Sequence, residues 1–382
     1  MTAEATAMQG PLDGIRVIEI GQALAGPLAG VILADMGADV IKIEKPDGGD
    51  DARLWGPPFI EGDALFFHAM NRNKRSVTID ITQDGDIARL KKMVLDADVV
   101  IQNLRPGIVE KFGIAPADLL VVNPRLIYCS IWAFGAAGPL RLAPGFDPLL
   151  QAYGGLMSMT GRKSDPPTFA GAAVNDKTTG MWCVIGALAG LRQRDITGKG
   201  CVVDTSLFES AVALVDGSVN GYLLGGKIPE RHGTASNLLT PYQTFETADR
   251  PICIAAGNDR LFVKLAKAMG HAEWSADPRF ENGRQRALHR PELVALMDAE
   301  LATRPRDHWM ALLEGVGVPC APVNDIGEVA NSPQLAAIDM VRELPGSGLK
   351  VMGLPISFDG ARPFPRSDSP RLGEHNSDFP TD

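Results

Sequence analysis

The chain has 382 residues, which at roughly 100–200 residues per domain is enough for two or three domains with substantial cores. Hydrophobic residues make up 45% and charged residues 22%, a globular composition that excludes an intrinsically disordered chain. With 37 basic and 46 acidic residues the formal net charge is −9, and no local basic patch offsets it, so nucleic acid is not expected as a partner.

The cysteines, histidines and longest apolar run exclude further classes. The five cysteines are scattered and never spaced as C-x-x-C, which indicates reduced thiols and neither a disulfide framework nor a zinc site. The six histidines form no H-x-x-x-H pair, so no metal site is predicted. The apolar run from Ile20 to Ala34 contains Gln22 and Pro27 and is too short to span a bilayer. We therefore expect a soluble, cytoplasmic protein with no membrane partner.

The first part of the chain alternates short β-branched runs with helical segments. Strands are predicted at 14–20, 39–44, 98–104 and 125–132, and helices at 28–36, 86–97 and 116–122. A strand, a helix and a second strand within about 30 residues form a βαβ unit, which implies parallel strands and a right-handed crossover. This half is therefore predicted to be a doubly wound, Rossmann-like α/β domain.

The pattern changes in the second half. The segment 145–195 is rich in Gly, Ala and Met and ends in a predicted long buried helix at 178–192. A β-hairpin is predicted from Tyr242 to Ala256, and charged helices follow at 259–269 and 289–302. These elements predict a smaller α+β domain.

Three parts of the chain are expected from this order of elements. They are a large α/β domain over 1–220, a small α+β domain over 225–320, and a C-terminal segment over 321–382. The last segment is rich in Pro and Gly and has few long periodic runs, so it is expected to return along the surface of another domain or subunit.

Polar residues at strand ends are the first candidates for binding. The passage Gly21–Pro27 joins a strand to a helix and could hold an anion, although it lacks G-x-G-x-x-G and a plain tight turn explains it equally well. Asn103-Leu104-Arg105 directly follows a strand, where open α/β sheets bind ligands. Solvated surface cations are the alternative for Arg105, Lys45 and Lys111.

Two aspartates are candidates for chemistry. Asp176 precedes the predicted buried helix, and the simplest interpretation is a helix N-cap. A carboxylate beside a Gly/Ala-rich segment can also be a covalent nucleophile. Asp147, in Pro144-Gly-Phe-Asp-Pro148, is by default an Asx-turn residue.

Taken together, these segments resemble the family III CoA-transferases, which include formyl-CoA transferase, the carnitine CoA-transferase and 2-methylacyl-CoA racemase. The resemblance covers nearly the whole chain and rests on the number and order of its motifs. They are Pro11-Leu-Asp-Gly-Ile-Arg-Val-Ile-Glu, Gly26-Pro27, Ala34-Asp-Met-Gly-Ala-Asp-Val-Ile-Lys-Ile-Glu, Asn73-Lys-Arg-Ser, Asn103-Leu-Arg-Pro-Gly, Gly145-Phe-Asp, Gly315-Val-Gly-Val-Pro-Cys-Ala-Pro-Val and Pro370-Arg-Leu-Gly-Glu-His.

The resemblance implies roles for particular residues. Asp176 matches the nucleophile that attacks an acyl-CoA thioester, forming an aspartyl anhydride and then an aspartyl-CoA thioester, without ATP, metal or a permanently bound cofactor. Asp147 matches a second acidic position near the reaction centre. The positions expected to bind CoA are Leu24, Ala25, Lys45, Ile79, Thr82, Asn103, Leu104, Arg105 and Lys111.

Three departures from the family narrow the activity. Leu24 stands where formyl-CoA transferase has Gln, which disfavours formate/oxalate exchange. The segment His232–Ser236 replaces the glycine-rich loop of that enzyme. Phe146 stands where the racemase has a histidine base, and loss of the imidazole disfavours racemisation.

The function expected from the resemblance is transfer of CoA between an acyl-CoA and a small carboxylic acid, with a dicarboxylic acid favoured because such acids are common family substrates. A 2-methylacyl-CoA racemase and a non-catalytic CoA-binding or dinucleotide-binding protein are the alternatives. The family also implies an interlocked, ring-like homodimer whose active site lies between subunits.

Overall fold

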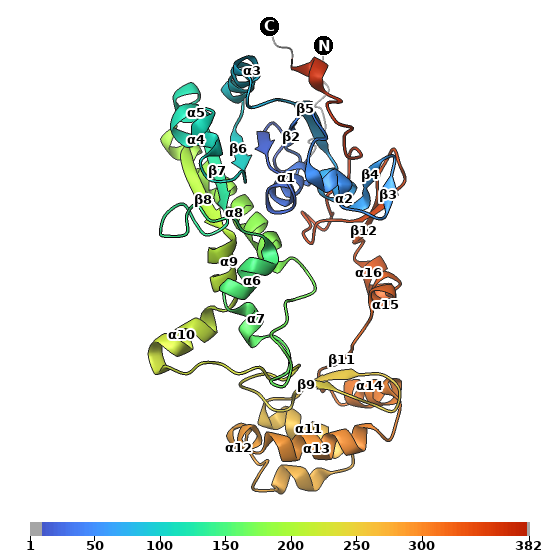
Figure 1. Ribbon diagram of the computed structural model, residues 1–382. Coiled ribbons are helices and arrows are strands. Elements are labelled where there is room, and N and C mark those ends of the chain that lie inside the picture. The colour runs from blue at the N-terminus through green and yellow to red at the C-terminus, as the bar shows by residue number, and fades with distance from the viewer. Residues whose placement is uncertain (1–9, 380–382) are drawn as a thin grey trace. The chain divides into compact units, whose positions relative to one another are not determined.

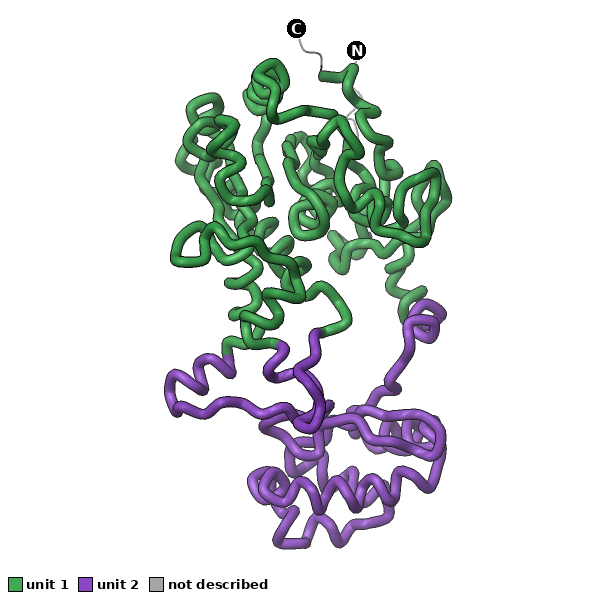
Figure 2. Tube along the Cα trace, in the orientation of Figure 1, with its two compact units in different colours: residues 1–156, 170–216, 333–382 green, residues 157–169, 217–332 purple. Residues whose placement is uncertain are grey.

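The computed structural model describes residues 10–379, and the chain forms two compact units (Figures 1 and 2). The first unit consists of 1–156, 170–216 and 333–382, and the second of 157–169 and 217–332. Residues 1–9 and 380–382, which the predicted outer boundaries included, lie outside the described part.

The first unit is built on a six-stranded parallel sheet in the order β5-β2-β1-β6-β7-β8. Its strands are β1 (Arg16–Ile20), β2 (Asp39–Glu44), β5 (Lys74–Thr78), β6 (Val99–Gln102), β7 (Ile127–Trp132) and β8 (Cys201–Ser206). The chain runs outward from β1 to one edge and then returns to build the other half, so the predicted doubly wound fold is confirmed. The two edge strands, β5 and β8, were not predicted.

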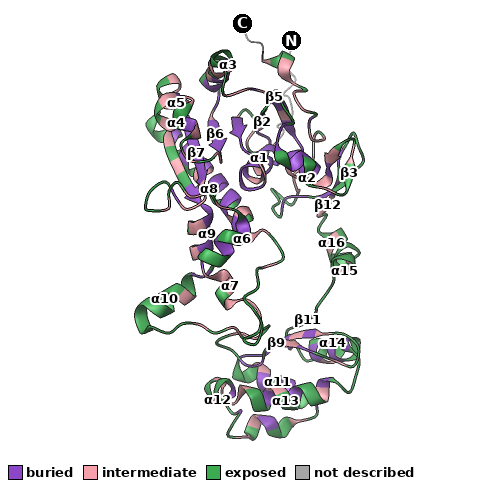
Figure 3. Ribbon diagram, in the orientation of Figure 1, coloured by how far each residue is buried: buried purple, intermediate pink, exposed green. Residues whose placement is uncertain are grey.

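Helices cover both faces of this sheet. The helices of the first unit as a whole are α1 (Ala25–Asp35), α2 (Leu65–Asn71), α3 (Asp84–Leu95), α4 (Ile108–Lys111), α5 (Pro116–Val122), α6 (Asp147–Tyr153), α8 (Val174–Thr197), α9 (Leu207–Leu214) and α16 (Pro333–Ala337). Successive strand residues point to opposite faces, so Val17 packs with α1 and α8, whereas Ile18 packs with α3 and α5. The buried residues accordingly follow the strands in Figure 3.

Helix α8 is longer than the predicted 178–192 and packs closely on α1. The close approach requires Gly180, because a Cβ there would lie 2.8 Å from the carbonyl oxygen of Ala25. The contact brings the first turn of α1 beside the N-terminal part of α8.

The second unit has its own sheet and core. The predicted hairpin is present as β9 (Tyr242–Phe245) and β10 (Ile252–Ala255), and β11 (Cys320–Pro322) adds a third antiparallel strand. Its helices are α11 (Asp259–Ala268), α12 (Gly283–Leu288), α13 (Arg290–Leu301), α14 (Arg306–Gly315) and α15 (Ile326–Ala330). Phe245, Phe262 and Trp309 belong to one core cluster of this unit, so it buries apolar surface independently of the large sheet.

Short elements complete the chain. They are β3 (Phe59–Ile60), β4 (Asp63–Ala64), α7 (Leu156–Met159), α10 (Asp216–Gly225), β12 (Val341–Glu343), β13 (Lys350–Met352) and the 3₁₀ turns η1 (Asp51–Leu54), η2 (Ala272–Ala276) and η3 (Asn376–Asp378). The end of the chain covers edge strand β5: the Asn376 side chain accepts a hydrogen bond from the Thr78 N–H and donates one to the Thr78 hydroxyl. Covering an edge strand in this way blocks its pairing with another chain.

A fully buried network of charged side chains joins the neighbouring strands β1, β2 and β5. The Glu19 carboxylate on β1 forms ion pairs with the Lys42 ammonium of β2 at 2.9 Å and with the Lys74 ammonium of β5 at 2.7 Å. All three side chains are 0% exposed. Burial lowers the pKa of Lys74 to about 8, against the opposing influence of Glu19. Helix α1 makes room for this network at Gly30, where a Cβ would lie 1.8 Å from the Glu19 carboxylate.

We expect Gly30→Ala to destabilise the chain by about 1–3 kcal/mol, because the added methyl group would force Glu19 away from Lys74. Gly85→Ala on α3 is the matched control, since that glycine is also helical and a Cβ there meets nothing within 4 Å. It should stabilise the chain by about 0.5 kcal/mol. Urea unfolding followed by circular dichroism measures both changes, and equal effects would contradict the proposed clash.

Candidate active site

The carboxyl ends of β1 and β6 mark the point where the strand order of the large sheet reverses, and such points form ligand crevices. The loop after β1 and the residue after β6 meet there. Asn103 accepts a hydrogen bond from the Gln22 N–H at 2.9 Å and donates one to the Gln22 carbonyl at 2.8 Å. The predicted passage Gly21–Pro27 is therefore fixed to the end of the neighbouring strand.

A cavity of about 520 Å³ opens at this point. Its walls include the loop Gln22–Ala25, the segment Asn103–Pro106, the segment Ala143–Phe146 and the side chain of Asp176. The cavity thus collects residues from several separate parts of the chain, all of them within the first unit.

Five of the predicted CoA-binding residues line this cavity, namely Leu24, Ala25, Asn103, Leu104 and Arg105. Sequence reasoning missed others that do so, including Trp55, Trp132 and Leu207. Trp132 is the last residue of β7 and Leu207 directly follows β8, so both lie at carboxyl ends of sheet strands; the strand of Trp132 was predicted, whereas β8 was not.

The other four predicted binding residues are not in the cavity wall. Lys45 forms a 2.7 Å ion pair with Asp51, which does line the cavity. Ile79 is buried in the core beside the sheet. The Thr82 hydroxyl donates a hydrogen bond to the Asp80 carboxylate, and the Lys111 ammonium lies over the ring of Phe112.

Asp176 lies in the first turn of α8, and Ala173 is the N-cap residue. The interpretation of Asp176 as an N-cap is therefore wrong. The helix starts four residues earlier than predicted, because the cap is supplied from elsewhere in the chain. Asp176 is consequently free to direct its carboxylate into the cavity that it lines.

Asp147, at the start of α6, supplies the missing cap. One of its carboxylate oxygens accepts hydrogen bonds from the N–H groups of Asn175 at 2.7 Å and Asp176 at 3.1 Å. The other accepts from the Gln151 side chain at 2.5 Å. A carboxylate at this end of a helix satisfies orphan N–H groups and interacts favourably with the helix dipole. Asp147 is buried behind Asp176 and holds the turn that carries it.

The position of Asp176 changes its acidity. Burial, together with the negative charge of Asp147, raises the pKa of the Asp176 carboxyl to about 7. A carboxylate of that basicity is a stronger nucleophile than a solvated aspartate at the same pH. Helix α1 begins at Ala25 in the same cavity wall, and the N–H groups of a first helical turn can stabilise a developing oxyanion.

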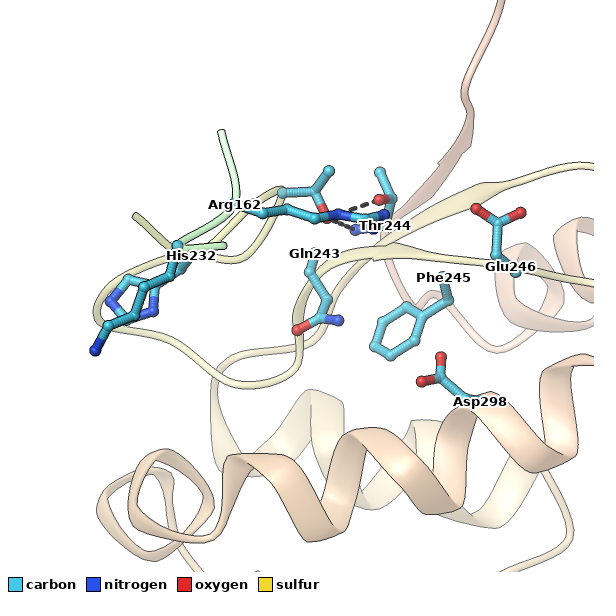
Figure 4. Close-up of a pocket in the computed structure, with 10 residues that line it drawn as sticks. Arg162, His232, Gln243, Thr244, Phe245, Glu246 and Asp298 are labelled. Atoms are coloured by element: carbon cyan, nitrogen blue, oxygen red, sulfur yellow. Dashed lines mark hydrogen bonds between the residues drawn. The ribbon is translucent and has the colours of Figure 1, made fainter. Parts of the chain in front are cut away.

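A second cavity, of about 370 Å³, lies within the second unit (Figure 4). Arg162 and His232 lie on one side of it, and Glu246 and Asp298 lie on the other. These four side chains belong to exposed residues, whereas Phe245 is buried. The predicted loop 232–236 therefore contributes to a polar pocket of the second unit.

Residues 10–379 contain neither a group of side chains placed to hold a metal ion nor a helix suited to cross a membrane. No cluster of three or more His, Cys, Asp or Glu side chains is placed there to hold a metal ion. No helix in that range combines the length and apolar character that crossing a bilayer requires.

Comparison with known proteins identifies the family. The sequence profile described as CoA-transferase family III matches residues 12–376. The acetyl-CoA:oxalate CoA-transferase of Acetobacter aceti is 36% identical, over 97% of this chain and 95% of its own length. The succinyl-CoA:glutarate CoA-transferase of Mus musculus is 35% identical, over 96% and 84%. The crystal structure of a CAIB/BAIF family protein from Brucella suis superposes with a TM-score of 0.87 at 40% identity, covering 97% of this chain and 98% of that one. The chain therefore belongs to CoA-transferase family III.

Proposed function

We propose that the chain transfers CoA from an acyl-CoA to a small dicarboxylic acid, with Asp176 as the covalent nucleophile. The observation that carries this proposal is the half-buried Asp176 carboxylate, raised in pKa to about 7, in a cavity at the switch point of the sheet. Arg105 lies in the same wall, where a guanidinium suits the phosphates of CoA. The names of two relatives support a dicarboxylic acid as substrate. The Acetobacter aceti relative is named for oxalate, and the Mus musculus relative for succinyl-CoA and glutarate.

The reaction follows from this nucleophile. The Asp176 carboxylate attacks the thioester carbonyl, which forms a mixed anhydride and releases CoA thiolate. The thiolate attacks the Asp176 carbonyl, which frees the donor acid and leaves an aspartyl-CoA thioester. The acceptor carboxylate attacks that thioester, which forms a second mixed anhydride and releases the thiolate again. The thiolate then attacks the acceptor acyl group of this anhydride, which forms the acceptor acyl-CoA and restores the Asp176 carboxylate. One thioester is lost and one is formed, so no energy source is consumed.

Asp147 acts through Asp176 in this proposal. It anchors the first turn of α8 by two N–H contacts and adds the negative charge that helps to raise the pKa of Asp176. Racemisation is not favoured, because the phenyl ring of Phe146 in the cavity wall cannot act as a base. None of the residues that line the cavity is histidine.

We also propose that the chain works as an interlocked homodimer in the cytoplasm, as the family resemblance implies. Apolar side chains on α10 support a partner surface: Tyr222 is 52% exposed, Leu223 73% and Leu224 91%.

Incubation with acetyl-, succinyl- or formyl-CoA, followed by hydroxylamine and peptide mass spectrometry, should give a hydroxamate on Asp176. Hydroxylamine captures the activated aspartyl group. Asp176→Asn should abolish the modification. Asp195→Asn, at the exposed far end of the same helix, should retain it. If none of the three donors labels Asp176 in a chain that binds CoA, the transferase mechanism is wrong.

The rate of Asp176 acylation should rise as the pH increases through about 7, since only the ionised carboxylate attacks. Asp147→Asn removes one of the two causes of the raised pKa, so its profile should move to lower pH. Single-turnover release of CoA thiol, measured between pH 5.5 and 8.5, gives both profiles. Identical midpoints would show that Asp147 does not set the acidity of Asp176.

Asp176→Asn should stabilise the chain increasingly as the pH rises. The unfolded aspartate ionises near 3.8 and the folded one near 7, so its ionisation disfavours the folded state between these values, and fully above them. The gain in melting temperature over the unmodified chain should therefore grow from pH 4 to pH 7 and then level off. A pH-independent gain for Asp176→Asn would contradict the raised pKa of this carboxyl.

A further inference from the structure

The loop Gly21–Leu24, between β1 and α1, forms one wall of the active-site cavity and is tied down along its length. Asn103 holds the Gln22 backbone by two hydrogen bonds, and the Lys42 ammonium donates to the Gly21 carbonyl at 2.8 Å. The remaining contact comes from Asp50, whose carboxylate accepts a hydrogen bond from the Ala23 N–H at 3.1 Å. Asp50 lies outside the cavity wall and is 1% exposed.

The contact with Asp50 coincides with an unusual backbone conformation. Ala23 has φ +65°, in the left-handed region that a residue with a Cβ rarely occupies. Such a conformation persists only where surrounding interactions determine it. The hydrogen bond from the Ala23 N–H to a buried carboxylate is an interaction of this kind, because a return of Ala23 to negative φ would break it and take this charged acceptor away from the N–H.

Asp50 is itself held rigidly. The same oxygen that contacts Ala23 accepts a second hydrogen bond, from the Ala52 N–H at 3.0 Å, and the other oxygen lies 2.9 Å from the Lys42 ammonium. Burial acts to lower the pKa of Lys42, but the carboxylates of Glu19, Asp50 and Glu44 outweigh it and raise that pKa. Lys42 therefore stays charged and keeps Asp50 in place.

The conformation of Ala23 determines where the following residues lie. Leu24 and Ala25 come directly after it, line the cavity with Asp176, and open helix α1. A return of Ala23 to negative φ would redirect the chain just before these residues. The part of the cavity wall that Leu24 and Ala25 form would then shift relative to α8, although Asp50 itself does not line the cavity.

We propose that Asp50 is a positioning residue for acyl transfer: it holds Ala23 in the left-handed conformation and so sets the part of the wall that Leu24 and Ala25 form in the cavity that Asp176 also lines. The inference rests on the proposed function and adds a requirement to it. What matters is the acceptor atom that Asp50 presents to Ala23, not only its charge. Asparagine at this position keeps an acceptor oxygen and loses the charge, whereas alanine loses both.

Asp50→Ala and Asp50→Asn should therefore differ in rate. Acylation of Asp176 should fall about ten- to hundredfold in Asp50→Ala and recover most of that loss in Asp50→Asn, because displacement of about 1 Å at a reaction centre has effects of that size. The rate is measured with whichever of acetyl-, succinyl- and formyl-CoA labels the unmodified chain. The affinity for CoA itself, from calorimetry, should change by less than about threefold in both variants.

Asp35→Asn is the stability control, since Asp35 is a buried acid paired with Arg72 at the far end of α1. It should lower the melting temperature without lowering the rate. Equal rates in Asp50→Ala and Asp50→Asn would overturn the proposal, because a purely structural ion pair would be lost equally in both. Absence of labelling in the unmodified chain would instead refute the proposed function.

Ala23→Pro tests the same contact from the other side if Asp50→Ala does not fold. Proline removes the N–H donor and forbids positive φ, while it leaves Asp50, Lys42 and Ala52 in contact. The rate should fall as in Asp50→Ala, with the affinity for CoA little changed. An unchanged rate in Ala23→Pro would overturn the proposal.

Discussion

The carboxylate of Asp147 at the N-terminus of α8 joins the fold to the chemistry of the site. It satisfies the N–H groups of Asn175 and Asp176, which no residue of α8 can do, and it thereby lets the helix start before Asp176. The same negative charge adds to burial in raising the pKa of Asp176. One side chain therefore holds the turn that carries Asp176 and helps to set the basicity of its carboxylate.

The part of the cavity wall that Gln22–Ala25 form is supported by a different kind of interaction. There the ion network of Glu19, Lys42 and Lys74 extends through Asp50 to the backbone of the loop after β1. Because parallel neighbours bring Glu19 and Lys42 into register, the network is a direct consequence of the strand order. The packing of Gly180 against Ala25 then joins the two walls through α1 and α8.

Much of the large sheet could be predicted from sequence, because β1, β2, β6 and β7 are apolar runs bounded by turns or helices. Strand β5 could not, since it begins with Lys74 and Arg75, and only the ion pair with Glu19 explains a buried lysine there. Six residues of the cavity wall were expected from the family resemblance, namely Leu24, Ala25, Asn103, Leu104, Arg105 and Asp176. The cap of α8 by Asp147 was not, because it joins residues 28 and 29 positions apart, and no local pattern records such a contact.

The charge partners of buried acids distinguish the site from the rest of the first unit. Glu19, Glu44 and Asp35 each pair with a lysine or arginine, as buried carboxylates usually do. Within the described residues Asp147 forms no such ion pair and is held by N–H donors alone. A cation beside it would neutralise its charge and lower the pKa of Asp176. Stabilisation by neutral donors keeps Asp147 in place and leaves its field acting on the Asp176 carboxyl.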